Sequence, residues 1–190
     1  MYKIVAKEEV APYIYKVEVE APLVAEKAKP GQFIIVIPDE NGERVPFTIS
    51  DWSSEKGTIT FYFLIAGVST QKMRRMKAGE RFHAVVGPLG KPATIEKEGE
   101  VFIGGGCFGI GAIYPIVRAH KEAGCHVTCA VEGRSKEVLY NLEKLKRVSH
   151  HFIVCTSDGG GDLKGKVHDA LSKLVGEGKV FKRAYFIGCS

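Results

Sequence analysis

The sequence lacks the features that mark membrane-spanning and secreted proteins. No apolar run approaches the roughly 20 residues that a membrane-spanning helix needs, and a representative run extends only from Phe33 to Ile37. The N-terminal residues carry mixed charge and contain no signal-peptide core. We therefore expect a cytoplasmic protein with no membrane partner.

Cysteine and histidine patterns that bind metals are also missing. The cysteines are odd in number, none forms a CxxC pair, and all lie in the second half: Cys107, Cys125, Cys129, Cys155 and Cys189. This excludes a disulfide framework and a classical zinc site, and we expect most of them to be small buried hydrophobic residues. The adjacent His150 and His151 would point to opposite sides of a strand, which is poor geometry for one metal. We expect no metal site.

A concentrated basic patch is absent as well. The formal net charge of +5 is spread over both halves of the chain, so the sequence does not support a nucleic-acid partner. Hydrophobic residues make up 45% and charged residues 26%, which is typical of a folded globular protein and argues against disorder. The 190 residues are enough for one or two domains.

The first half has the pattern of an all-β domain. Apolar and polar residues alternate from Tyr13 to Glu20 and from Thr58 to Leu64, as in half-buried strands. Clusters of glycine, proline, asparagine and serine separate such runs and are typical of turns. Strands are expected near 2–10, 13–21, 31–37, 45–50, 58–65 and 81–87, with a short helix over 69–77. The pattern predicts a small antiparallel β-barrel over residues 1–97.

The second half alternates strands with helices. Strands are expected near 101–103, 126–131, 152–155 and 184–187, and apolar residues at helical spacing lie between them, as in the stripe Val167, Leu171, Leu174 and Val175. The order βαβαβαβ predicts a parallel sheet wrapped by helices, a Rossmann-like domain over residues 98–190. The boundary is expected in the polar stretch from Glu96 to Glu100.

A glycine-rich stretch follows the first strand of this second half. Gly104, Gly106 and Gly109 satisfy G-x-G-x-x-G between a strand and a helix. Glycine permits close approach of the backbone to a pyrophosphate, and the helix N-terminus supplies unpaired N–H donors. This setting favours nucleotide binding over a turn that only packs the helix on the sheet. Pro115, a few residues inside the helix, costs a hydrogen bond or distorts the first turn.

The next strand ends at about the place where Rossmann-type proteins distinguish NAD from NADP. Glu132 could accept a hydrogen bond from a ribose 2′-hydroxyl, whereas Arg134, Ser135 and Lys136 could hold a 2′-phosphate. Three donors outnumber one acceptor, so the sequence favours NADP. The alternative is a solvated basic pair with Ser135 capping the next helix.

Several segments together resemble the ferredoxin–NADP reductase superfamily over essentially the whole chain. The greatest similarity is to its electron-transfer branch, which contains the flavin/iron–sulfur subunit of dihydroorotate dehydrogenase and the small subunit of sulfide dehydrogenase or NADH-dependent ferredoxin:NADP oxidoreductase. The segments that carry the resemblance are Lys29 to Phe33, Arg44 to Thr48, Gly67 to Thr70, Gly87 to Gly90, Gly104 to Pro115 and Gly133 to Lys136.

The resemblance implies an FAD-binding barrel followed by an NAD(P)-binding domain. It would place Pro46, Phe47 and Thr48 against the isoalloxazine ring, with Phe47 and Thr48 at the catalytic position, and Arg44 near the diphosphate. The other implied cofactor contacts are Gly67, Val68, Ser69 and Thr70 at the diphosphate, and Gly87, Pro88, Leu89, Gly104, Gly105, Gly106, Gly109, Gly111, Arg134, Ser135, Lys136, Ser157 and Asp158.

Three departures from the family pattern bear on these roles. The usual motif has arginine two residues before the aromatic, where this chain has Val45, and the arginine is Arg44. The glycine loop is one residue longer than the common Gly-x-Gly-x-Ala-Pro form. Relatives continue past the strand ending at Cys189 into a helix and a [2Fe–2S] segment, whereas this sequence ends at Ser190, so no cluster ligands are expected.

The sequence thus predicts an FAD-dependent electron-transfer subunit that moves electrons between NAD(P)H and a larger flavin/iron–sulfur partner subunit or a ferredoxin-like acceptor. One alternative is the electron-transfer subunit of dihydroorotate dehydrogenase, which would use NAD. The other is a docking module that retains the fold without catalysis. Because the last helix would be missing, Tyr185, Phe186 and Ile187 are expected to be only partly buried.

Overall fold

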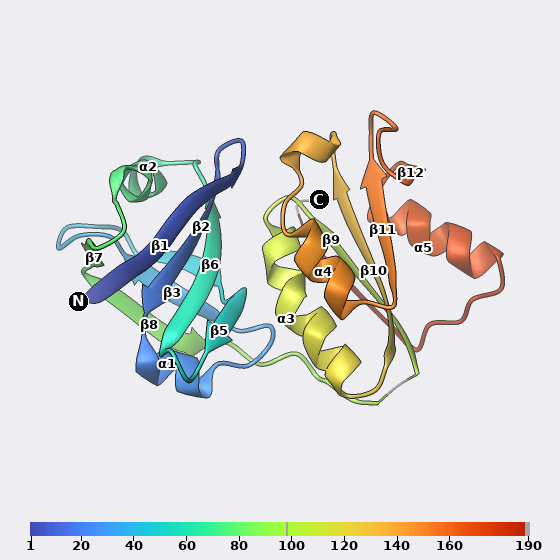
Figure 1. The fold of residues 1–190 in the computed structure, drawn as a ribbon, viewed down its shortest axis with the longest axis horizontal. Coiled ribbons are helices and arrows are strands. Elements are labelled where there is room, and N and C mark those ends of the chain that lie inside the picture. The colour runs from blue at the N-terminus through green and yellow to red at the C-terminus, as the bar shows by residue number, and fades with distance from the viewer. Residues whose placement is uncertain (98, 189–190) are drawn as a thin grey trace. The chain divides into compact units, whose positions relative to one another are not determined.

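The chain forms two compact units, Met1–Ala93 and Thr94–Ser190, which are described separately (Figure 1). The computed structural model describes residues 1–97 and 99–188. The division falls a few residues before the polar stretch in which the sequence places the boundary.

Antiparallel strands make up nearly all of the first unit. Its elements are β1 (Tyr2–Ala11), β2 (Ile14–Glu20), α1 (Pro22–Lys27), β3 (Phe33–Ile37), β4 (Val45–Thr48), β5 (Asp51–Ser53), β6 (Thr58–Leu64), α2 (Val68–Arg75), β7 (Arg81–Phe82) and β8 (Ala84–Leu89). One sheet has the order β5-β6-β2-β1-β7 and the other the order β4-β3-β8. The predicted β-barrel architecture is confirmed, with α1 and β5 as additions that the sequence pattern did not indicate.

The core of this unit follows from the alternation in β2 and β6. Val17 and Val19 are fully buried, and the ring of Tyr15 stacks on that of Phe63 with centroids 5.3 Å apart. Tyr13, which the sequence places in the same stripe, lies instead in the β1–β2 turn with a φ of 65° and is 61% exposed. Pro12 and Tyr13 form the two-residue turn between the strands, so Tyr13 lies outside the ladder and away from the buried face.

The second unit is a five-stranded parallel sheet. Its elements are β9 (Glu100–Gly106), α3 (Gly109–Glu122), β10 (His126–Gly133), the 3-10 helix η1 (Lys136–Val138), α4 (Leu142–Val148), β11 (His151–Thr156), β12 (Leu163–Lys164), α5 (Val167–Gly176) and β13 (Arg183–Ile187). The strand order is β12-β11-β10-β9-β13. The predicted Rossmann-like architecture is confirmed.

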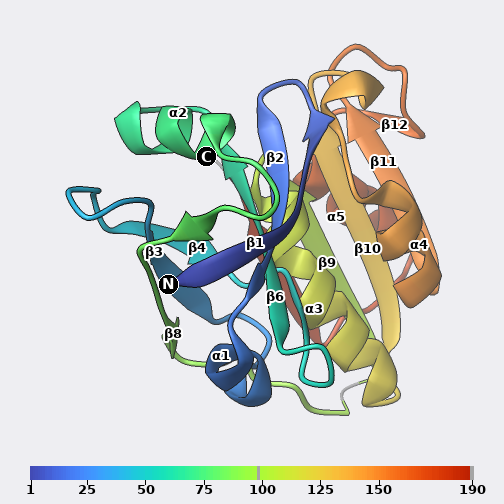
Figure 2. The same cartoon turned by 60° about the vertical axis from the view of Figure 1, so that its left-hand side comes forward.

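Helices cover both faces of this sheet. Figure 2 shows α3 and α4 in front of the strands and α5 behind them. Phe102 on β9 packs with Val167, Ala170 and Leu174 of α5 in one buried cluster, whereas Val175, which the sequence adds to that stripe, is 53% exposed. No helix within residues 1–97 and 99–188 has both the length and the apolarity needed to cross a membrane.

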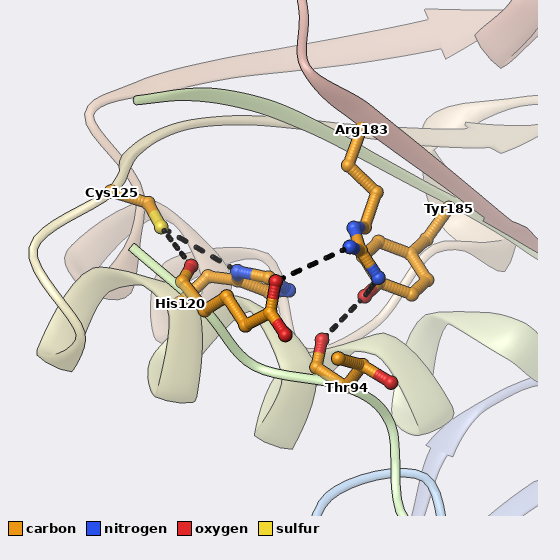
Figure 3. Close-up of polar contacts among 6 residues, drawn as sticks. Thr94, His120, Cys125, Arg183 and Tyr185 are labelled. Atoms are coloured by element: carbon orange, nitrogen blue, oxygen red, sulfur yellow. Dashed lines mark hydrogen bonds and ion pairs between the residues drawn. The ribbon is translucent and has the colours of Figure 1, made fainter. Parts of the chain in front are cut away.

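Side chains at the amino-terminal edge of the parallel sheet hold the segment that enters the second unit (Figure 3). The Tyr185 hydroxyl donates to the carbonyl oxygen of Thr94 at 2.8 Å, and the Cys125 thiol donates to that of Glu96 at 3.1 Å. The guanidinium of Arg183 lies 3.9 Å from the Glu96 carboxylate. Cys125, directly before β10, and two residues of β13 therefore fix the start of this unit.

Candidate functional site

The start of α2 is shaped by a threonine. Gly67 is the N-cap residue in an extended conformation, and the Thr70 hydroxyl accepts from the backbone N–H groups of Ala66 and Gly67 at 2.9 and 3.0 Å. The same hydroxyl donates to the carbonyl oxygen of Gly67. Thr70 therefore builds the turn, and its hydroxyl is already engaged rather than available to a ligand.

A carboxylate from a distant loop lies on the same turn. The hydroxyl of Ser69, which is only 5% exposed, donates to Oε2 of Glu43 at 2.5 Å. Around Gly67 an added Cβ would meet no atom within 4 Å, and Val68 is 70% exposed. The first turn of α2 thus binds an anionic oxygen through the Ser69 hydroxyl and leaves space beside it. This arrangement fits a phosphate group.

The β4 segment separates its predicted contact residues onto two faces. The Phe47 ring stacks on the core residue Phe61 with centroids 5.0 Å apart, so it belongs to the packing of the barrel. Pro46 and Thr48, one residue to either side, lie on the opposite face of the strand. Arg44, directly before β4, is exposed. Of the two predicted catalytic residues, only the side chain of Thr48 faces away from the core.

The Gly87 to Gly90 segment is joined to the turn before β3 by a buried glutamine. Nε2 of Gln32 donates to the Gly90 carbonyl oxygen, and Oε1 accepts from the Lys29 backbone N–H, each at 3.0 Å. A Cβ at Gly87 would lie 2.7 Å from Cγ2 of Ile34. Glycine here is required by packing against β3, and its neighbours Pro88 and Leu89 are half-buried.

The glycines at the end of β9 and the first residue of α3 are required by close packing. A Cβ at Gly104 would lie 3.0 Å from Val167 on α5, and one at Gly105 would lie 2.8 Å from Ile113 on α3. A Cβ at Gly106 would lie 2.7 Å from Cγ of Glu132, and one at Gly109 would overlap the carbonyl oxygen of Ile187. These positions bring α3, α5 and β13 close to the strand.

Tyr140 occupies the start of α3. Its hydroxyl accepts from the backbone N–H of Gly111 at 3.1 Å and donates to the carbonyl oxygen of Phe108 at 3.2 Å. The side chain is 3% exposed, and burial raises the pKa of its hydroxyl well above the usual range. The sequence predicted unpaired N–H donors here, but the Gly111 donor is satisfied within the protein, and that of Ile110 approaches the Cys107 carbonyl at 3.4 Å.

The loops after β10 and β11 lie together at the carboxyl end of the sheet. The backbone N–H of Ser157 donates to the Gly133 carbonyl oxygen, and that of Asp158 donates to the Arg134 carbonyl oxygen, each at 3.1 Å. These bonds bring together the predicted residues Arg134, Ser135, Lys136, Ser157 and Asp158. Arg134 and Lys136 are exposed at this edge.

Two acidic groups accompany these basic side chains. A hydrogen bond from Ser135 lowers the pKa of Glu137, and a backbone hydrogen bond from Gly160 lowers that of Asp158. Both carboxylates are therefore ionised at neutral pH and offset the charges of Arg134 and Lys136. The group of residues is nearly neutral as a whole, which favours a dianionic ligand less than the sequence indicates.

A pocket of about 580 Å³ opens where the strand order reverses, between β9 and β13. Gly106, Glu132, Val167, Phe186 and Gly188 are among its lining residues. Oε2 of Glu132 accepts from the Val167 backbone N–H at 2.6 Å, so this carboxylate holds the start of α5. Crevices at such reversals are the usual ligand sites of open α/β sheets.

The cysteines are free thiols with mainly structural positions. Cys125, Cys129 and Cys155 are buried, which confirms the prediction for these three, and burial raises the pKa of Cys155 to about 11. Cys107 is half-exposed, and Cys189 lies outside the described residues. Within residues 1–97 and 99–188, no three His, Cys, Asp or Glu side chains are placed to hold a metal ion.

Comparison with known proteins identifies the family. The chain is 37% identical over 177 residues to a dihydroorotate dehydrogenase B electron transfer subunit homolog of Thermotoga maritima, covering 93% of this chain and 62% of that protein. It is 31% identical over 196 residues to the corresponding electron transfer subunit of Enterococcus faecalis, covering 100% of this chain and 73% of that protein. The chain belongs to the ferredoxin–NADP reductase superfamily. Within it, the chain is a member of the family of dihydroorotate dehydrogenase B electron transfer subunits.

Solved structures agree with this placement in the superfamily. The NADH-dependent reduced ferredoxin–NADP oxidoreductase is similar with a TM-score of 0.93 and 34% identity, over 99% of this chain and 67% of that one. A ferredoxin–NADP+ reductase of Plasmodium falciparum has the same fold, with a TM-score of 0.78 at 16% identity over 100% of this chain and 85% of that one. No family model matches the chain.

The chain is shorter than several of its superfamily relatives. It spans 66% of a Clostridium beijerinckii protein to which it is 39% identical over 99% of its own length.

Two residues of the site, Glu43 and Tyr140, were missed by sequence reasoning. An acid directly before Arg44 was the available signal for Glu43, whereas nothing local marks a tyrosine that reaches back to α3.

Proposed function

We propose that this chain is an FAD-binding electron-transfer subunit that moves electrons between NAD(P)H and a protein partner. The observation that carries the proposal is that the whole chain, both units included, belongs to a superfamily of reductases and electron transfer subunits. The pocket at the sheet reversal and the anion-accepting start of α2 support it.

The flavin would be held by the first unit. The Ser69 hydroxyl and the backbone at Gly67 and Val68 would receive the diphosphate, and the exposed Arg44 would supply a cation. Thr48 would offer its hydroxyl to the flavin edge. FAD, when bound, would supply hydride acceptance and onward transfer of electrons singly or in pairs.

The pyridine nucleotide would be held by the second unit. The loops containing Arg134 to Lys136 and Ser157 to Asp158 would bind its phosphate and ribose groups, and the pocket beside Gly106 would admit its other end. Hydride transfer itself requires no acid or base side chain, so these residues would orient the ring and exclude water.

The preference between NADP and NAD remains a hypothesis of this proposal. The sequence argument for NADP rests on Arg134, Ser135 and Lys136. The ionised Glu137 and Asp158 weaken that argument because they repel a dianionic 2′-phosphate. The relatives named for NAD(+) or NADH support the alternative that the chain is the electron-transfer subunit of a dihydroorotate dehydrogenase. A larger partner subunit is proposed in either case.

One visible spectrum of the purified protein, reconstituted with FAD, tests the proposal. We expect flavin bands at ~450 nm that bleach anaerobically on addition of NADPH or NADH. A protein that retains no flavin would contradict the proposal. Flavin that stays oxidised with both nucleotides would favour the non-catalytic docking module instead.

A further inference from the structure

The loop between β3 and β4 is fastened to α2 at two points. The Ser69 hydroxyl donates to Glu43, and the ammonium of Lys72, one turn further along α2, lies 2.8 Å from the Asp39 carboxylate. The Lys72 hydrogen bond lowers the pKa of Asp39, so this pair is charged at neutral pH. The loop therefore lies against the helix whose first turn would bind a diphosphate.

The two contacts involve different parts of α2. Asp39 pairs with a side chain on the body of α2, whereas Glu43 places a carboxylate at the helix start, where the N–H groups and the positive end of the helix dipole favour an anion. The first turn of α2 contains no acidic residue of its own. Glu43 therefore acts there as an internal anion.

We propose that Glu43 is a carboxylate gate at the flavin diphosphate site: its contact with Ser69 and a diphosphate bound at the start of α2 exclude each other. This inference rests on the proposed FAD site. Two anionic groups at one hydroxyl repel each other, so binding of the diphosphate requires Glu43 to release Ser69. The gate lowers the affinity and the association rate of ligands that carry phosphate, and leaves riboflavin unaffected.

The loop is built so that Glu43 can leave while the rest stays in place. The Gly42 backbone N–H donates to the Asp39 carbonyl oxygen at 2.9 Å. The Asn41 backbone N–H donates to Oδ1 of the Asp39 side chain at 3.2 Å. This compact turn is anchored by Lys72 independently of Ser69. Glu43 follows the turn and is exposed, so a rotation near it releases the contact.

The test compares Glu43→Gln with Glu40→Gln in the full chain. Both changes remove one negative charge from the same exposed loop, but only Glu43 contacts Ser69. Protein stripped of flavin is titrated with FAD and with riboflavin by fluorescence, and FAD association is followed by stopped flow. For Glu43→Gln we expect FAD to bind on the order of three- to tenfold more tightly, the range set by loss of one charged competitor. Riboflavin affinity should not change.

The control and the melting temperature separate the gate from general charge effects. Glu40→Gln should change FAD affinity by less than about twofold, as expected of a solvent-screened charge. Without flavin, Glu43→Gln should melt slightly lower because it loses a charged hydrogen bond, yet its FAD-induced rise in Tm should exceed that of the original protein.

Equal FAD affinity in the original protein and Glu43→Gln would overturn the gate while leaving the flavin site intact. An equal gain in FAD affinity in both variants would also overturn the gate, because it would show a long-range effect of the loop's charge. If neither the original protein nor Glu43→Gln binds FAD, the proposed function itself fails and the gate fails with it.

Discussion

The two units each begin a helix at a glycine-containing turn, and the two turns are built for different purposes. At α2 an added Cβ on Gly67 meets open space, and the Ser69 hydroxyl holds a carboxylate from another loop. At α3 the Gly111 N–H is taken by Tyr140, and a Cβ on Gly109 would overlap a backbone carbonyl. The glycines of a G-x-G-x-x-G pattern can therefore serve packing, while the anion-accepting helix start lies in the barrel.

The largest effect should come from filling the packed turn. Gly109→Ala drives a methyl group into the Ile187 carbonyl and should destabilise the second unit by about 3 kcal/mol or more, the upper range for overpacking. Gly67→Ala should cost about 0.5–1 kcal/mol, the loss of a favourable N-cap residue. Urea unfolding by far-UV circular dichroism measures both, with Trp52 fluorescence reporting on the first unit alone. Equal losses of unfolding free energy in both variants would contradict the difference between the packed start of α3 and the open start of α2.

Charge reversal at the β10 loop tests where the second unit recognises its ligand. If Arg134 holds a 2′-phosphate, Arg134→Glu should weaken NADP(H) by about 1.5–3 kcal/mol, the range for hydrogen bonds to charged groups, and NAD(H) far less. Titration with both nucleotides measures the difference. Equal losses would assign selectivity elsewhere and strengthen the NAD interpretation.

Removing the Tyr140 hydroxyl tests whether its hydrogen bonds at the start of α3 stabilise the second unit. Tyr140→Phe leaves the Gly111 N–H and the Phe108 carbonyl without their partner, and should destabilise the second unit by about 1–3 kcal/mol. Tyr114→Phe is the matched control, since the Tyr114 ring faces the cationic groups of Arg118 and Lys144 and retains that face. An unfolding curve unchanged by Tyr140→Phe would mean that water replaces the hydroxyl.

The smallest effect is expected on the barrel side. Thr48→Val keeps the shape of the side chain and removes its hydroxyl, so it should weaken or retune bound flavin by about 0.5–1.5 kcal/mol, as for a neutral hydrogen bond. Flavin affinity and midpoint potential are the measurements. Phe47→Leu, which changes only the core-facing ring, should alter stability more than potential. If Phe47→Leu changes the flavin midpoint potential more than Thr48→Val does, the two faces of β4 have been assigned the wrong way round.

Local patterns predicted the architecture because periodicity is a property of neighbouring residues. The alternation in β2 and β6 and the helical stripe at Val167 each reflect one buried face, and the structure contains those faces. Tyr13 departs from the pattern because a turn, rather than the ladder, fixes its backbone.

The site was less predictable because its contacts join distant residues. Glu43 reaches Ser69 across 26 positions, and Tyr140 reaches Gly111 across 29. The position of Glu43 directly before Arg44 was a weak local signal, and the sequence around Tyr140 contains none. The glycine motif was recognised correctly as a strand–turn–helix junction. Only the three-dimensional packing shows that its glycines leave no room for a side chain and that the Gly111 N–H is already bonded.

Strand edges give the two units different tendencies to self-associate. Both outer strands of the three-stranded sheet contain a proline, Pro46 in β4 and Pro88 in β8, which cannot donate to an added strand. Within the described residues of the second unit, the edge strand β12 has two residues, whereas β13 has five and no proline. A neighbouring chain can extend the sheet at β13, so concentrated preparations of these 190 residues should aggregate through the nucleotide-binding unit first, and through the barrel last.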